Sequence, residues 1–158
     1  MIQRIQSLLL AGVVILLTIN LFVPIWSSSN GITEVKLTAF SIDLDIKGKA
    51  AGLFTKKTAV YYVGGLISLN IALALLIIFQ FKNRARQILL CNLLTLLTLG
   101  IIGSYFIAIP KAKTMMVAGS GDYGIGYFLP IIACMLIMAA RYYIKKDEEL
   151  VRSVDRLR

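Results

Sequence analysis

The sequence predicts an all-α membrane protein, in which four transmembrane helices form a bundle and residues 1–158 make up a single membrane domain. Hydrophobic residues make up 58% of the chain and charged residues 16%, with a mean hydropathy of +0.81. A soluble domain has roughly 45–50% apolar and about 25% charged residues, so this composition excludes an ordinary soluble protein. Four apolar runs are long enough to cross a bilayer: 7–26, 60–81, 88–109 and 127–143. Each must be helical, because lipid offers no hydrogen-bond partner to a free backbone group.

The first run, 7–26, follows Arg4 and at first sight resembles a signal peptide. The run is longer than the apolar region of a typical signal peptide, and Pro24-Ile25-Trp26 stands where small residues precede a cleavage site. We therefore interpret it as an uncleaved signal anchor.

The outer loop 27–59 contains a stretch of strict alternation, which predicts a half-buried strand in a small hairpin. The apolar residues of this stretch are Phe40, Ile42, Leu44 and Ile46, and the polar ones are Ser41, Asp43, Asp45 and Lys47. Val35 and Leu37 form a second alternating piece in the other register, which predicts a bulge or bend near Thr38-Ala39. An isolated hairpin is marginal in water, so its apolar face must cover either the bundle or a partner.

Two loop motifs resemble known chemical sites without their usual surroundings. Asp43 and Asp45 form the Asp-x-Asp pair of metal-dependent transferases, but no third ligand is evident, and we expect no metal site. The segment 119–126 is rich in glycine, as phosphate-binding loops are. Such loops lie between a strand and a helix of a βαβ unit, whereas this segment joins two spans, so we expect a flexible connector.

The asparagines within the first three spans, Asn20, Asn70 and Asn92, lie at different depths. Interhelical hydrogen bonding is the usual role of such residues, and we expect these three to pack between helices. A polar pathway through the bundle is the alternative. The spans hold no charged residue before Arg141, which argues against a coupled transporter.

Small and polar residues also predict how the second and third helices pack. Gly64, Ser68 and Ala72 form a small-residue stripe along one face of the second helix, and Asn70 lies on another face. A helix with two packing faces is expected to lie at the centre of the bundle. The third helix has polar residues at every third position, which predicts a packing seam: Asn92, Thr95 and Thr98.

The fourth helix is expected to continue into the cytoplasm as an amphipathic helix within the tail 144–158. Apolar residues recur there at helical spacing, and acidic residues are mixed with basic ones, which favours a protein contact over an anionic lipid surface. The residues expected to bind a partner are Leu150, Val151, Arg152, Val154, Asp155, Arg156 and Leu157.

Lysine and arginine residues next to the spans predict the orientation. The turn 82–87 holds Lys82, Arg84 and Arg86 with no acidic residue, and the tail is also rich in basic residues. Both termini are therefore expected on the cytoplasmic side of the membrane. These boundary residues account for the net charge of +9, so the lipid bilayer and other membrane proteins are the expected partners, and nucleic acid is not.

The sequence gives no support for an enzyme. It contains no histidine, the residue most used as a general base and as a metal ligand. Cys91 and Cys134 lie at different depths in two spans, which argues against a disulfide and predicts two small apolar side chains. We expect no catalytic, cofactor-binding or metal site.

Three segments of the chain together resemble those of a known family. They are the opening Met1-Ile2-Gln3-Arg4-Ile5-Gln6, the turn Lys82-Asn83-Arg84 followed by Leu90-Cys91, and the ending from Lys145 to Arg158. Over its whole length the sequence resembles a family of small inner-membrane proteins from Bacteroidota, catalogued as domain of unknown function 4293. The resemblance implies four spans and carries no established activity, so it assigns no functional residue.

These observations favour a non-catalytic accessory or scaffold subunit of a larger inner-membrane complex, held by its lipid-facing helices and by the tail. The alternative is a small permease or lipid-handling protein that acts as a homo-oligomer, with the three asparagines along a polar route. A third hypothesis is an envelope sensor that receives a signal at the outer strand and transmits it through the tail.

Overall fold

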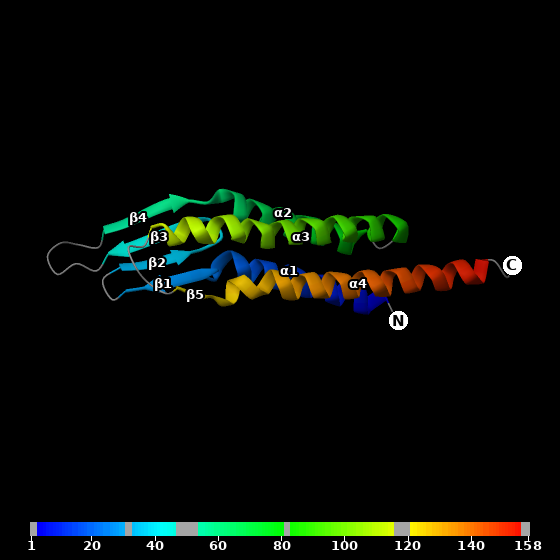
Figure 1. Cartoon of the computed structure of the whole chain (residues 1–158). Coiled ribbons are helices and arrows are strands. Elements are labelled where there is room, and N and C mark those ends of the chain that lie inside the picture. Colours follow the sequence, from blue (N-terminus) through cyan, green and yellow to red (C-terminus); the bar gives the residue numbers. More distant parts are fainter. Residues whose placement is uncertain (1–2, 31–32, 47–53, 81–82, 116–120, 156–158) are drawn as a thin grey trace.

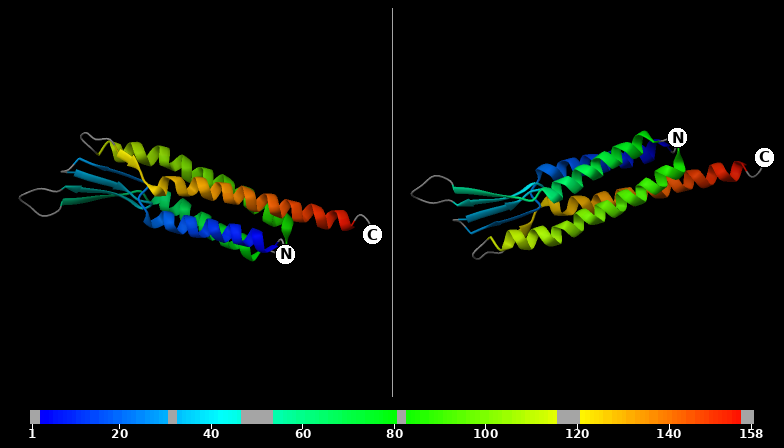
Figure 2. Two further views of the ribbon diagram at one scale, coloured as in Figure 1. Left: turned by 90° about the horizontal axis from the view of Figure 1, so that it is seen from below. Right: turned by 90° about the horizontal axis from the view of Figure 1, so that it is seen from above.

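The computed structural model describes residues 3–30, 33–46, 54–80, 83–115 and 121–155, and within them the chain forms four helices and five strands (Figure 1). The helices are α1 (Gln3–Phe22), α2 (Tyr61–Phe79), α3 (Arg84–Lys113) and α4 (Ile125–Asp155). The strands are β1 (Trp26–Ser29), β2 (Thr33–Leu37), β3 (Ser41–Ile46), β4 (Phe54–Ala59) and β5 (Gly121–Tyr123). The helices run along the long axis of the molecule. The sheet lies at one end, the sheet end, and the start of α1 and the end of α4 lie at the other, the terminal end (Figures 1 and 2).

The helices agree with the predicted spans in number and differ from them in length. In the part of the chain that the structure describes, four helices are long and apolar enough to cross a membrane. α1 ends at Phe22, because Pro24 has no N–H group and disfavours helical backbone at the residue before it. α3 and α4 extend beyond the apolar runs 88–109 and 127–143 at both ends, since a helix that leaves the bilayer keeps its internal hydrogen bonds.

The helices form a ring rather than a cluster around a central helix. α1 packs against α2 and α4, and α3 packs against the same two helices. The prediction that the second helix is central is therefore wrong. The buried positions alternate in steps of three and four residues, as in α4: Ala133, Ile137, Ala140, Ile144 and Asp147. A mean repeat of 3.5 residues is that of a left-handed helical bundle.

The prediction of an all-α protein is wrong, because the described residues contain a five-stranded antiparallel sheet in the order β4-β3-β2-β1-β5. β2 and β3 are the predicted hairpin, and Leu37 pairs with Ile42 at its closed end. The backbone N–H of Thr38 donates to the carbonyl of Ser41 at 2.9 Å, so the expected bulge is a tight turn between two strands. β1 and β4 flank the hairpin, and β5 adds a strand from the segment before α4.

The two faces of the sheet differ in character. Trp26, Leu37 and Ile42 are neighbours across three strands, and all three side chains are buried. Their face packs against the last turns of α3, where Ile109 and Ala112 are buried in the same core. This contact explains the length of α3, whose 30 residues span ~45 Å against a hydrocarbon core of ~30 Å. The sequence predicted that the apolar face of the hairpin covers either the bundle or a partner. In the structure it covers the protein's own bundle, at α3.

The glycine-rich segment before α4 is packed where the structure describes it, and the prediction of a flexible connector is wrong there. A Cβ atom at Gly121 would fall inside the indole ring of Trp26, so only glycine lets β5 lie against that ring. The backbone N–H of Gly124 donates to the carbonyl of Ile25 at 3.0 Å, and that of Gly126 to the carbonyl of Pro24 at 3.2 Å. The earlier part of the predicted connector, 119–120, lies outside the described residues.

Candidate functional site

The predicted asparagines occupy three separate places. Asn20 donates from Nδ2 to the Tyr105 hydroxyl at 2.9 Å, which joins α1 to α3. Asn70 accepts from the Thr98 hydroxyl at 3.1 Å, which joins α2 to α3. Asn92 lies on the exposed side of α3. Two of the three residues therefore make interhelical hydrogen bonds, and the structure does not bring the three together.

Apolar side chains fill the bundle between these two hydrogen-bonded pairs. Asn20 and Tyr105 lie nearer the sheet end, and Asn70 and Thr98 lie about two turns further toward the terminal end. One fully buried side chain from each helix occupies the layer between them: Leu17, Ile67, Ile101 and Ala133. The two polar pairs are therefore separated by packed hydrocarbon.

A third polar group joins the helices at the terminal end. Gln6 of α1 donates from Nε2 to a carboxylate oxygen of Asp147 at 2.6 Å, and both side chains are buried. Arg84 of α3 donates to the backbone carbonyl of Asp147 at 2.8 Å. Gln87, also buried, donates to the carbonyl of Ile77 at 3.0 Å. Each of these bonds fixes the depth of one helix against a neighbour.

The predicted partner-binding tail is partly described. α4 continues as a helix to Asp155, and Val151, Arg152 and Val154 belong to it. Leu150 is 50% exposed, and Lys145 lies 3.9 Å from Glu149 on the same exposed surface. Arg156 and Leu157 lie outside the described residues. In Figure 1 the end of α4 projects past the other helices at the terminal end.

The small residues of α2 and α3 lie mostly on outward surfaces. Ser68 and Ala72 of the predicted stripe are exposed, while Gly64 is buried against the ring of Phe40. Three further glycines, Gly65, Gly100 and Gly103, have open space where a Cβ atom would lie. Because Asn70 and Thr98 set the register of these antiparallel helices, Gly65 lies near the depth of Gly103, and Ser68 near that of Gly100. We call Gly65, Ser68, Gly100 and Gly103 the small-residue face.

The opposite, polar face of the sheet carries Asp43 and Asp45 among balancing charges. Lys36 lies 2.8 Å from Glu34, and the strand register places Asp43 directly opposite Lys36. The hydrogen bond and charge of Glu34, followed by the charges of Asp45 and Asp43, raise the pKa of Lys36 above its ordinary value of 10.5. Among the described residues no group of three or more Cys, Asp or Glu is placed to hold a metal ion.

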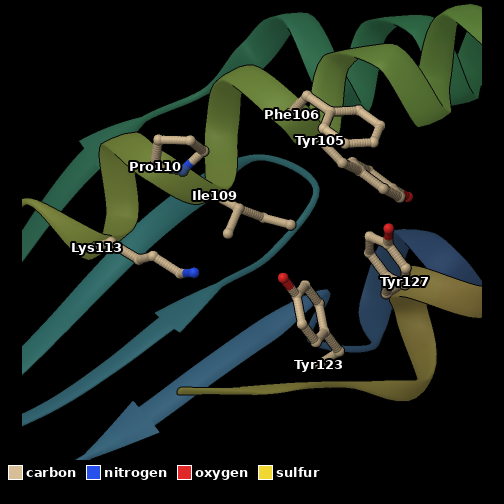
Figure 3. A pocket seen from close by; sticks show the side chains of 7 residues that line it. All are labelled: Tyr105, Phe106, Ile109, Pro110, Lys113, Tyr123 and Tyr127. Atoms are coloured by element: carbon tan, nitrogen blue, oxygen red, sulfur yellow. The ribbon is translucent and has the colours of Figure 1, made fainter. Parts of the chain in front are cut away.

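A pocket of about 130 Å³ opens between α3 and the start of α4 (Figure 3). Its lining residues come from α3, β5 and α4: Tyr105, Phe106, Ile109, Pro110, Lys113, Tyr123 and Tyr127. The ring of Tyr127 lies 4.8 Å from that of Tyr123 and 5.9 Å from that of Tyr105, measured between centroids. Figure 3 shows the Lys113 ammonium group and the Tyr123 hydroxyl directed toward the space between α3 and β5.

The sequence profile of the family described as "Domain of unknown function (DUF4293)" matches residues 2–157 of the chain. The chain belongs to the DUF4293 family. The match covers almost the whole chain and confirms the resemblance seen in the sequence. No curated protein matches the chain. The family description names no activity, so functional arguments for this DUF4293 chain rest on its geometry.

Sequence analysis missed several of the polar residues that this DUF4293 chain buries. The predicted spans leave out Gln6 of the opening segment, Gln87 of the basic turn and Asp147 of the tail, yet all three side chains are buried. A signal was present in their spacing, because Gln6 precedes Asn20 by fourteen residues, which is two heptads. The pocket had no comparable signal, since its residues come from segments that only the fold brings together.

Proposed function

We propose that this DUF4293 protein is a non-catalytic accessory subunit of a larger inner-membrane complex, and that it packs against a membrane partner through the small-residue face of α2 and α3. The observation that carries the proposal is the position of this face. Gly65, Gly100 and Gly103 have nothing near their Cβ positions, and Ser68 is exposed.

Small outward residues matter because hydrophobicity does not drive helices together in lipid. Association there depends on close backbone approach, and Gly, Ala, Ser and Thr allow it. Within this bundle, by contrast, the ring of helices is filled by large side chains such as Leu17, Ile67 and Ile137. The small-residue face is therefore shaped to receive a helix from another chain.

The orientation of the protein forms part of the proposal. Arg84, Arg86, Arg141 and Lys145 lie toward the terminal end, beside the points where the helices leave the apolar region. Basic residues next to spans stay in the cytoplasm, so we place the terminal end there and the sheet on the outer side of the inner membrane. The projecting end of α4, around Leu150, then offers a second contact for the partner in the cytoplasm.

The alternative function, a small permease or lipid-handling homo-oligomer, is less well supported. A polar route would require the asparagines to line one continuous path. Asn92 faces outward instead, and the apolar layer of Leu17, Ile67, Ile101 and Ala133 separates Asn20 from Asn70. A bundle packed in this way holds its helices in place and leaves no polar path between these residues.

The test is a pull-down of the full chain, tagged at its N-terminus, expressed at native level and purified in mild detergent. Quantitative mass spectrometry gives the stoichiometry of every co-purifying membrane protein. The variant is Gly65→Leu with Gly100→Leu, and the matched control is Ala11→Leu on the exposed side of α1. Overpacking at a helix contact costs ~1–3 kcal/mol, so we expect roughly fivefold or greater loss of the partner in the variant alone.

A wild-type protein that purifies alone, as a monomer or as a homo-oligomer, would contradict the accessory role. If the double variant recovered the partner as well as wild type does, the small-residue face would not be the interface. Truncation after Leu150 tests the tail separately, and we expect it to weaken recovery. The orientation is tested by labelling Lys57→Cys and Glu149→Cys with an impermeant maleimide, and only the former, at the sheet end, should react in intact cells.

A further inference from the structure

The pocket between α3 and α4 lies where the bundle leaves the hydrocarbon core. The Thr98–Asn70 hydrogen bond sets the register of α2 and α3, so Tyr105 lies near the depth of Val63, close to the start of α2. The 19 residues of α2 cover ~28 Å, which is nearly the whole hydrocarbon core. Lys113 follows Tyr105 by eight residues and lies ~12 Å further out. The pocket therefore extends from the edge of the core into the headgroup layer.

The chemistry of the pocket changes along the same direction. At the deeper end, Phe106 is 71% exposed and faces the lipid. At the outer end, Lys113 supplies a positive charge, and none of the seven lining side chains is acidic. Asp122 is the nearest carboxylate in sequence, but it alternates with Tyr123 and pairs with Ser27 on the other face of β5. A group that enters the pocket from the membrane thus meets hydrocarbon first and a cation last.

The aromatic wall consists of three tyrosine rings that pack against one another. Tyr105 is fully buried, and its hydroxyl accepts the hydrogen bond from Asn20. Tyr127 lies between the rings of Tyr105 and Tyr123 and contacts both. Phenolic hydroxyls donate well to anionic oxygens, and donors that are already held in place bind with less loss of entropy.

We propose that this pocket binds the phosphate headgroup of an anionic phospholipid from the surrounding leaflet. Lys113 provides the counter-charge, the hydroxyls of Tyr123 and Tyr127 donate to the phosphate oxygens, and an acyl chain lies along Phe106. A volume of about 130 Å³ holds a headgroup and leaves the acyl chains in the bilayer. A soluble phosphate would carry the same chemistry, but the depth of the pocket and the exposure of Phe106 favour the lipid. The site goes beyond the proposed accessory role and does not depend on it.

The test uses the full chain, stripped of lipid by detergent exchange and titrated with dioctanoyl phosphatidylglycerol, with native mass spectrometry counting bound molecules. The variant is Lys113→Gln, and the matched control is Lys111→Gln, an exposed lysine on α3 that does not line the pocket. We expect one lipid per chain in wild type and control. Loss of a charge-assisted contact to the phosphate should weaken binding roughly tenfold or more in Lys113→Gln.

Two further probes separate the sources of phosphate. Dioctanoyl phosphatidylcholine should bind more weakly than phosphatidylglycerol, and inorganic phosphate should not displace the bound lipid at millimolar concentration. Equal binding by Lys113→Gln and Lys111→Gln would overturn the proposal, as would equal affinity for the two lipids. Displacement by inorganic phosphate would assign the site to a free anion and overturn the lipid assignment. Emission from Trp26, which pairs with Tyr123, verifies that each variant remains folded.

Discussion

Replacing Gly121 by alanine is expected to disrupt the contact between β5 and the rest of the sheet. A Cβ atom at this position would lie within the indole ring of Trp26. Trp26 is only 1% exposed and is enclosed by the core between the sheet and α3, so its ring has no free space to rotate into. The alanine must therefore push β5 away from β1, where it pairs through Trp26–Tyr123, Ser27–Asp122 and Ser28–Gly121.

The expected cost follows from the packing. Inserting a methyl group into a well-packed core costs ~1–3 kcal/mol. For a chain of this size, 1 kcal/mol lowers the melting temperature by about 2–4 °C, so Gly121→Ala should melt about 2–12 °C below wild type. The matched control is Gly103→Ala in α3, where nothing lies within 4 Å of the Cβ position. Alanine is favoured over glycine in a helix by up to ~1 kcal/mol, so the control should melt at or above the wild-type temperature.

The assay uses the protein's only tryptophan, which is Trp26 itself. Thermal unfolding in detergent, followed by intrinsic fluorescence, reports the stability and the burial of that ring together. We expect Gly121→Ala to show a lower melting temperature and emission shifted to longer wavelength. If it melts with Gly103→Ala and keeps the wild-type emission, the strand has room to move and the packing argument is refuted.

Three further predictions concern the polar contacts. Asn70→Leu removes the acceptor of Thr98 and should cost about 0.6–1.7 kcal/mol in thermal unfolding, whereas Asn92→Leu on the exposed side of α3 should leave stability unchanged. Asp147→Ala leaves the buried Gln6 amide without its 2.6 Å partner and should cost ~1–3 kcal/mol, with faster hydrogen exchange at the start of α1. Its control, Glu149→Ala, removes an exposed 3.9 Å contact and should change stability by less than about 1 kcal/mol. Lys36→Gln removes the 2.8 Å partner of Glu34 and the positive charge opposite Asp43, and it should lower the melting temperature at neutral pH. Because the pKa of Lys36 is raised in the folded protein, its charge stabilises wild type fully below pH 10.5. This stabilisation is lost as the pH rises through the higher pKa of the folded state. A loss of this stabilisation at neutral pH in wild type would contradict this account.

The strands show what the sequence could and could not predict. β2 and β3 alternate in hydrophobicity, so the hairpin was evident without a structure. β1 is Trp-Ser-Ser-Ser and β5 is Gly-Asp-Tyr, and neither contains enough residues to show a period. β1 is a strand because it pairs with β2 and β5, and β5 is a strand because it pairs with β1. Pairing between distant segments leaves no local signal. The protein therefore looked all-α when only the hairpin was visible.

Which side of each helix is buried could not be predicted from the sequence, for a different physical reason. In water, an exposed helix face is polar and the buried face stands out, but in lipid both faces are apolar. The seam Asn92–Thr95–Thr98 was predicted from polarity alone, and it is wrong because Asn92 is exposed and Thr98 is buried. The correct seam steps by four and three residues from Gln87 through Cys91, Leu94 and Thr98.

The polar contacts are placed where a bundle in lipid needs them. Without a hydrophobic force between helices, the depth of each helix is set by directional bonds, and the described residues make such bonds near both ends of the ring. Gln6 fixes α1 against Asp147 of α4 at the terminal end, and Asn20 fixes α1 against Tyr105 of α3 at the sheet end. Tyr105 also lines the pocket. A lipid headgroup bound there would therefore hold the residue that links α1 to α3, so added lipid should raise the melting temperature of wild type and raise that of Lys113→Gln less.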